Sequence, residues 1–453
     1  MPTAADRYPP QVRYIVWNEG AERFSFYGMR SILTVYMASY LGFPGNEAEA
    51  NYHWFVAACY LTPLVGGWLA DRLWGRYRVI LWISLGYVAG HALMAAWESR
   101  WGLFFALSLI AMGSGGIKPC VSAYVGDQFR PEQSRLLERV YGLFYWMINL
   151  GSTFSTLLIP KLLARYGPSV AFAVPGVFMA LALVIFVAGR KLYVNMPPTG
   201  PDPHAFGRVV ADAARRLGTR PGHWLDGALD RHPEAAVDGA KAVFRIMGVF
   251  AAVTAFWALF DQHGSSWVLQ AQRMDLAVWG WTLQASQLSA LNPFMVLLLI
   301  PVFSRLVFPG LVKAGLRVTP LGKMSAGMFV TVLSFASATA IDVLLARGVA
   351  VSALWQVPQY LFLTAGEVLV SVTGLEFSYT QAPRSMKSTI MSIWFLTIFA
   401  GNVLTGLVSK VNVFQGWGYF AFFTGLMLAA AVAFVLVARA YRPAGAAKEA
   451  QAA

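Results

Sequence analysis

Runs of about 20 mostly apolar residues follow one another along the chain, with short polar segments between them. A helix of that length is about 30 Å long, which matches the hydrocarbon core of a membrane. The pattern therefore predicts twelve membrane-spanning helices. Their approximate bounds are 14–41, 50–71, 77–97, 102–126, 138–163, 169–193, 241–270, 278–304, 319–344, 350–378, 384–409 and 417–440.

One polar stretch, residues 195–240, is much longer than the other loops and has six predicted spans on either side. It separates an N-terminal six-helix bundle, 1–194, from a C-terminal six-helix bundle with a short tail, 241–453. The fold class predicted is an all-α membrane protein of two bundles. Within the linker, 205–217 and 222–230 are weakly amphipathic and fit either helices at the membrane surface or solvated linker helices.

Composition agrees with a membrane protein, since 57% of the residues are hydrophobic, 13% are charged and the mean hydropathy is +0.54. Soluble domains usually carry about 25% charged residues. The net charge of +13 does not indicate nucleic-acid binding, because most of the 35 lysines and arginines fall on one predicted side of the membrane. Basic loops stay in the cytoplasm, so both termini are predicted to be cytoplasmic. Compact loops, together with a composition rich in Ala and Arg, suggest a bacterial inner (plasma) membrane.

Cysteines and histidines predict neither a metal site nor a cofactor. Cys59 and Cys120 lie in apolar segments, where small buried thiols act as packing residues. The six histidines show no spacing typical of metal ligands. The spans also lack an H-E-x-x-H motif, paired aspartates and a serine–histidine signature, which argues against a membrane-embedded enzyme.

Seven charged residues lie well inside the predicted spans, away from the span ends. A charge that faced lipid at mid-bilayer would cost roughly 2.5–3.5 kcal/mol on insertion scales. These side chains are therefore expected to face a water-filled path or one another. They are Glu19, Glu22, Arg23, Arg30, Lys118, Asp261 and Glu367.

An inner layer of charge is predicted from residue counts along the spans. At about 1.5 Å per residue, Lys118 and Glu367 both lie about 26 Å from the outer ends of their spans. These spans are equivalent members of the two bundles, so the ammonium and the carboxylate are expected to pair. Glu22 lies at a similar level.

An outer layer is predicted from Arg30, Asp261 and His53, with Asn149 and Asn292 at mid-depth between the two layers. Arg30 and Asp261 are expected to pair when the outer end is closed, with His53 near enough to influence them. A binding level between two closable ends is what alternating access requires, and it disfavours a simple channel.

The first span carries its charges in the stretch EGAERFSFYGMR, residues 19–30. Polar and aromatic residues recur there at three- or four-residue steps, which places them on one helix face. They are Glu19, Glu22, Arg23, Phe26, Tyr27 and Arg30. The face fits a transport path or, alternatively, a self-neutralised structural cluster.

Glycines surround Lys118 on the fourth span. Gly113, Gly115 and Gly116 fit either a weakened helix or close helix packing. Pro119 removes a backbone donor, so a local bend is predicted.

Several of these stretches resemble the proton-coupled oligopeptide transporters of the major facilitator superfamily. EGAERFSFYG resembles their E-x-x-E-R-F-x-Y-Y-G motif, and GGWLADRLWGRYR resembles the superfamily's loop signature. GSGGIKPCVSAYVGDQF and FYWMINLGS resemble the family's two signatures, and FWALFDQHGSSWVLQAQ extends the match into the second half. The resemblance implies a twelve-helix symporter that imports di- and tripeptides with protons by alternating access.

The resemblance also implies roles for individual residues. Proton coupling would involve Glu19, Glu22, Arg23, His53 and Asp261. Arg30 and Lys118 would attract the peptide carboxylate, and Glu367 would receive the amino group. Peptide contacts and side-chain pockets would come from Asn149, Asn292, Tyr27, Tyr60, Trp257, Trp394 and Phe395. Phe26 replaces the first tyrosine of the family motif, so one hydroxyl contact is absent.

The partners implied are di- and tripeptides, protons as the coupling ion and membrane lipid, with no nucleic acid and no other cofactor. The main alternative is a relative that carries nitrate or another small anion. The joint presence of Lys118 and Glu367 favours a zwitterion instead.

Overall fold

The chain is largely helical in the computed structural model. The residues described are 8–200, 202–218, 222–381, 383 and 386–441. The first residues of the predicted N-terminal bundle, 1–7, and the tail of the C-terminal one, 442–453, therefore lie outside the described residues. Within these ranges, nine helical segments are long and apolar enough to cross a membrane. The count of twelve crossings and the cytoplasmic side of both termini stay predictions.

Between residues 8 and 200, the structure describes five α-helices. Their bounds are α1 (Val12–Val35), α2 (Gly45–Leu69), α3 (Arg76–Ala96), α4 (Arg100–Gly126) and α5 (Ser134–Ala188). Shorter turns follow at Tyr36–Tyr40, Ala70–Trp74 and Pro131–Gln133. Two predicted spans, 138–163 and 169–193, are joined in α5, which kinks at Gly167, where φ is +79°, and ends at Ala188.

The second half begins with α7 (Glu234–Phe260). The helices after it are α8 (Ser266–Ala271), α9 (Leu291–Val302), α10 (Phe308–Lys313), α11 (Pro320–Ala346), α12 (Gln356–Glu367), α13 (Thr373–Gln381), α14 (Lys387–Val411) and α15 (Trp417–Ala440). Short helical turns connect them at Asp261–Gly264, Ala285–Ala290, Phe303–Val307, Ala353–Trp355 and Val368–Val372.

Two predicted spans differ from the structure. The seventh, 241–270, is interrupted by the turn Asp261–Gly264. The eighth was predicted to begin at residue 278, but that position lies in a hairpin of β1 (Ala277–Val278) and β2 (Trp281–Thr282). Trp279 and Gly280 both adopt positive φ in the hairpin turn, which ends any helix there.

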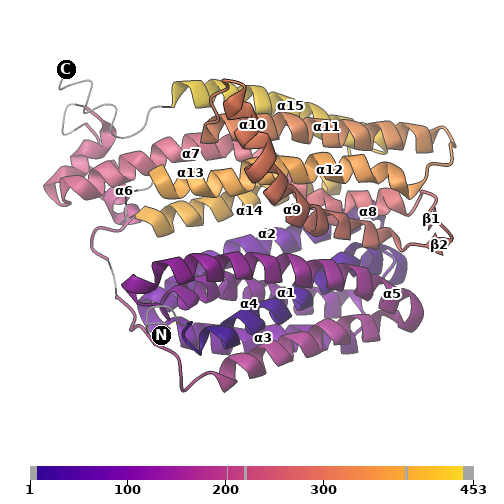
Figure 1. Ribbon diagram of the computed structural model, residues 1–453, viewed down its shortest axis with the longest axis horizontal. Helices are drawn as coiled ribbons and strands as arrows, with labels where there is room; N and C mark the ends of the chain where they lie inside the picture. Colours follow the sequence, from indigo (N-terminus) through magenta and orange to yellow (C-terminus); the bar gives the residue numbers. More distant parts are fainter. Residues whose placement is uncertain (1–7, 201, 219–221, 382, 384–385, 442–453) are drawn as a thin grey trace.

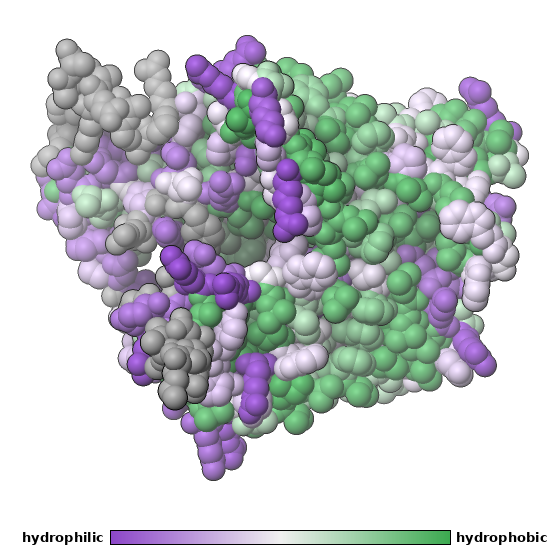
Figure 2. Space-filling model, viewed as in Figure 1, coloured by the Kyte–Doolittle hydropathy of each residue, from purple (hydrophilic) through white to green (hydrophobic). Residues whose placement is uncertain are grey.

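Each half of the chain has its own apolar core. One extends from Val12 to Tyr193, and the other extends from Val243 to Phe434. Figure 1 shows the indigo-to-magenta half lying along the orange-to-yellow half. In Figure 2, hydrophobic side chains cover much of the middle of this face, with hydrophilic ones gathered toward its ends. The boundaries predicted at either side of the linker stay predictions.

The linker folds onto the start of α7. Its two amphipathic pieces form α6 (Phe206–Arg215) and a turn at Trp224–Asp230. Val209 on α6 and Leu225 in the turn are buried in one small core with Val237 of α7. The apolar face of the linker is therefore covered by protein, which favours solvated linker helices over helices embedded in the membrane surface.

The glycines of α4 allow close helix packing. A Cβ atom on Gly115 would lie 1.7 Å from Thr62 Oγ1 of α2, and one on Gly113 would lie 2.4 Å from Tyr87 Cβ of α3. On α2, a Cβ atom on Gly66 would lie 2.5 Å from Gly116 Cα. Close packing thus accounts for these glycines without invoking a weakened helix.

Gly66→Ala is expected to destabilise the first half, because the added methyl group would press on the backbone of α4. Overpacking of this kind typically costs about 1–3 kcal/mol. Thermal unfolding in detergent should show a lower Tm for this variant. The neighbouring Gly67→Ala is a matched control, since nothing lies within 4 Å of the atom it adds. Equal Tm values for both variants would contradict the close contact.

Candidate functional site

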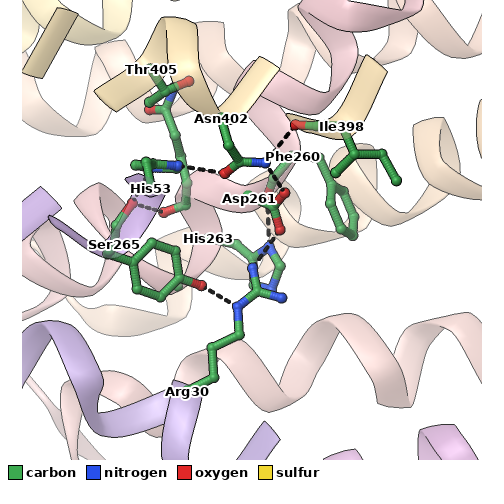
Figure 3. Close-up of polar contacts among 12 residues, drawn as sticks. Arg30, His53, Phe260, Asp261, His263, Ser265, Ile398, Asn402 and Thr405 are labelled. Carbon is green, nitrogen blue, oxygen red and sulfur yellow. Dashed lines mark hydrogen bonds and ion pairs between the residues drawn. The ribbon is translucent and has the colours of Figure 1, made fainter. Parts of the chain in front are cut away.

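An ion pair joins the two halves where α7 is interrupted. Arg30 of α1 donates a hydrogen bond to Asp261, the first residue of the turn after α7 (Figure 3). Arg30 Nε also donates to the hydroxyl of Tyr52 at 2.6 Å. Both charged side chains are buried. The structure thus brings together the two residues that the sequence predicts as the outer pair.

Asn402 of α14 connects His53 to this pair. Its Nδ2 donates to Asp261 Oδ2 at 2.7 Å, and its Oδ1 lies 2.8 Å from His53 Nδ1. Because Oδ1 can only accept, His53 Nδ1 carries a proton, and His53 Nε2 can accept from Ser265 Oγ at 2.8 Å. His53 therefore reaches Asp261 through one intervening side chain (Figure 3).

The sequence reasoning missed Tyr52, Asn402 and Ser265. A polar amide in the apolar run around Asn402 was the available signal, since polar groups inside a membrane need partners.

Further contacts between the halves lie near this network. Thr34 Oγ1 donates to the carbonyl of Gly264 at 2.8 Å, and Lys410 pairs with Glu47 at 2.9 Å. These contacts involve the end of α1, the start of α2 and the end of α14, all distant from the linker. Figure 2 shows a hollow between the halves toward the linker side. The halves are therefore in contact at the predicted outer end.

Asp261→Asn is expected to favour opening of that end. Removing one partner of a buried ion pair leaves Arg30 uncompensated, at a cost of about 3–5 kcal/mol. A cost confined to the closed state shifts the population toward the open one. Labelling of single cysteines at the outer ends of α1 and α7 should increase from outside.

Lys410→Met is a matched control for this prediction. It removes an exposed pair with Glu47 at the same end, and exposed pairs contribute under about 1 kcal/mol. Its labelling should stay close to that of the unmodified protein. Unchanged labelling of Asp261→Asn, together with normal uptake, would show that the buried pair does not hold the end closed.

A cavity of about 360 Å³ lies between the halves beside this network. Both halves contribute to its wall. Its lining includes Tyr27, Arg30, Tyr60, Asn149, Trp257, Asn292, Glu367, Trp394 and Phe395, all of which the sequence analysis assigned to substrate contacts. Arg30 and Glu367 therefore offer a cation from one half and a carboxylate from the other to a single space.

Glu367 is the last residue of α12, and the helix continues as a π-turn, Val368–Val372. Such local widening is frequent at functional sites. Asn292 Nδ2 donates to Glu367 Oε2 at 2.8 Å and to Thr364 Oγ1 at 3.1 Å. A neutral donor thus orients the carboxylate toward the cavity without neutralising it.

The predicted pair of Lys118 and Glu367 is wrong for this conformation. In the described residues neither has an oppositely charged partner within 4 Å, and Lys118 Nζ lies 4.4 Å from the ring centre of Phe26 and 4.7 Å from that of Tyr60. The two aromatic faces stabilise the ammonium group by cation–π attraction. Lys118 lies beside Tyr60, which itself lines the cavity.

Asn292 and Glu367 lie within side-chain reach of each other, since Asn292 Nδ2 bonds Glu367 Oε2 directly. The mid-depth position of Asn292 stays a prediction.

Glu19, Glu22 and Arg23 form a buried cluster on α1. Arg23 Nε donates to Glu19 Oε1 at 2.7 Å and lies 2.9 Å from Glu22 Oε2. The contact with Glu22 lacks hydrogen-bond geometry, and neither of its buried oxygens accepts a hydrogen bond from the described residues. Within the part of the chain that the structure describes, Glu22 thus has Arg23 as a charge neighbour and accepts no hydrogen bond.

Comparison with protein families gives one clear match. The POT family model matches residues 77–416. Among curated proteins, peptide transporter 3 of Caenorhabditis elegans is 40% identical over 355 residues, which is 73% of this chain and 50% of that protein. Solute carrier family 15 member 2 of Mus musculus is 37% identical over 74% of this chain and 49% of its own length. The chain thus spans about half the length of these relatives.

Solved structures match over almost the whole chain. The POT family transporter PepTSo has a TM-score of 0.90 and 40% identity, with 96% of this chain and 99% of that one covered. A POT peptide transporter in complex with alafosfalin has a TM-score of 0.81 and 27% identity, with 95% and 94% covered.

Proposed function

The chain belongs to the POT family, and we propose that it imports di- and tripeptides together with protons by alternating access. Peptide transporter 3 of Caenorhabditis elegans and the transporter solved with alafosfalin are peptide transporters by name, which supports the peptide part of the proposal. The proton part rests on the resemblance of EGAERFSFYG to the family's E-x-x-E-R-F-x-Y-Y-G motif. Because the matched relatives are transporters, we propose a transporter and not an enzyme. The proposed location is the bacterial inner membrane.

One observation carries the proposal, namely that Arg30 and Glu367 line one cavity between the halves. A short peptide is a zwitterion, so a fixed cation and a fixed anion can bind its two ends. Its side chains vary, and aromatic walls such as Trp257 and Trp394 tolerate that variation. The cavity volume of about 360 Å³ falls in the usual range for small ligands.

We assign the substrate contacts accordingly. Arg30, with Lys118 once it leaves its aromatic neighbours, attracts the peptide carboxylate, and Glu367 binds the amino group. Asn149 and Asn292 contact the peptide backbone, while Tyr27 and Tyr60 line side-chain space together with the tryptophans.

Proton coupling is assigned to the α1 cluster and to the outer network. Glu19 and Glu22 exchange protons next to Arg23, while His53 and Asp261 respond where the halves meet. Protonation that weakens a charge pair frees the helices that the pair joins. The proton is the only coupling ion that the proposal requires.

Uptake of labelled dialanine into proteoliposomes tests the proposal. An inward proton gradient should drive accumulation above the level reached without a gradient, and excess unlabelled dipeptide should compete. A counterflow assay with dialanine and with nitrate distinguishes a peptide transporter from a transporter of small anions, since the latter would exchange nitrate but not dialanine. Uptake that ignores both the gradient and the competing dipeptide would contradict the proposal.

A further inference from the structure

Two histidines face each other in the linker, outside the predicted spans. His204 precedes α6, and His232 lies between the turn Trp224–Asp230 and α7. Their Nδ1 atoms are 3.0 Å apart, and their rings are inclined by 80°. The side chain of His232 is only 4% exposed. Two imidazole nitrogens from distant segments thus converge on one point.

Asp212 determines which nitrogen of His232 carries the proton. His232 Nε2 lies 3.1 Å from Asp212 Oδ2. A carboxylate oxygen accepts at this position, and Arg231 also lies 3.3 Å from Asp212 Oδ1. Nε2 of His232 is then the donor, and its Nδ1 directs a lone pair toward His204.

Backbone contacts hold both histidines in place. The backbone N–H of His204 donates to Asp202 Oδ1 at 2.8 Å, and that of His232 donates to the Ala228 carbonyl at 3.0 Å. Backbone hydrogen bonds therefore position the two imidazole rings, and their approach does not depend on long side chains. A separation of 28 residues hides the pair from any search for ligand spacing in the sequence.

We propose that His204 and His232 bind a divalent transition-metal ion of the zinc type through their Nδ1 atoms. Zinc–nitrogen bonds of about 2.0–2.1 Å at tetrahedral angles place two ligand nitrogens roughly 3.3 Å apart, close to the separation observed. His204 Nδ1 releases its proton to water as the metal–nitrogen bond forms. Water completes the coordination, since the described residues offer no group of three or more ligand side chains.

Asp212 acts as the outer partner of this site. Metal-binding histidines usually donate their other ring N–H to a carboxylate, which orients the ring and raises its basicity. His232 and Asp212 have this arrangement. The ion would connect the segment before α6 to the start of α7, independently of peptide binding.

Zinc titration of the full-length protein in detergent, without an affinity tag, tests the site. Calorimetry should show one saturable site per chain, and Co²⁺ should give the visible absorption of nitrogen ligation at the same stoichiometry. His204→Ala and His232→Ala should each abolish both signals. Asp212→Asn should weaken binding by about 10–100-fold, the usual effect of losing an outer partner.

His223→Asn is the matched control. His223 is an exposed linker histidine that accepts a hydrogen bond from the backbone of Leu225, a role that asparagine can keep. Its zinc binding should equal that of the unmodified protein. Dialanine uptake and thermal unfolding report whether each variant is folded, and Asp212→Asn retains both ligands if an alanine variant is not.

Two results would overturn the proposal. One is no saturable zinc binding by the unmodified protein at micromolar zinc. The other is binding of equal affinity by folded His204→Ala or His232→Ala protein, which would place the ion elsewhere.

Discussion

Glu367→Gln should reduce the rate of proton-driven dialanine uptake by about 10–100-fold. The carboxylate lines the cavity without a charged partner in the described residues, so it is available to a substrate ammonium group. Glutamine keeps the volume and can still accept from Asn292, but it loses the charge. A hydrogen bond to a charged group contributes about 1.5–3 kcal/mol, which corresponds to the factor given.

Initial uptake rates over a range of dialanine concentrations measure this effect. Glu376→Gln is a suitable control, because Glu376 lies on α13, is 57% exposed and pairs at 3.5 Å with Lys323. That variant should retain normal rates. Normal rates in Glu367→Gln at every concentration would remove Glu367 from the binding site. Peptide transport itself would still be decided by dialanine uptake of the unmodified protein.

Helix positions were largely predictable because the length of an apolar run decides whether a segment can cross a membrane. The last span shows this well, since the predicted 417–440 coincides with Trp417–Ala440. The eighth span fails because its first apolar residues, around Trp279, form a hairpin whose turn needs positive φ. Hydropathy alone does not distinguish an apolar hairpin from the start of a helix.

Candidate residues were predictable for a related reason. A charge in an apolar run needs a partner or a cavity, and Arg30, Asp261 and Glu367 each have one. The partner of each charge was harder to predict from the sequence. Lys118 lies over two aromatic rings instead of pairing with Glu367, and residue spacing along single helices does not distinguish an aromatic partner from a carboxylate.

Residues that support others were the hardest to find. Asn402 and Ser265 are not among the residues that line the cavity. Asn402 nevertheless connects His53 to Asp261, and Ser265 bonds the other nitrogen of His53. Their importance follows from geometry between helices, which residue spacing within one helix does not contain.

Glu22→Gln is expected to uncouple peptide movement from the proton gradient. Accumulation of dialanine against its gradient should fall at least about tenfold, while exchange of labelled for unlabelled dialanine at equal pH should persist. The carboxylate can gain a proton without breaking a hydrogen bond, because its buried oxygens accept none from the described residues. Glutamine keeps the shape and cannot take up that proton.

The contrast with Glu19 makes this prediction specific. Glu19 accepts the 2.7 Å hydrogen bond from Arg23, so Glu19→Gln would weaken the bond that orients this buried arginine and should impair exchange as well as accumulation. Glu98→Gln, at an exposed position before α4, should affect neither. If Glu22→Gln protein accumulated dialanine normally, Glu22 would not be an obligatory proton carrier. Loss of both accumulation and exchange would instead give Glu22 a structural role, as the self-neutralised cluster on α1 requires.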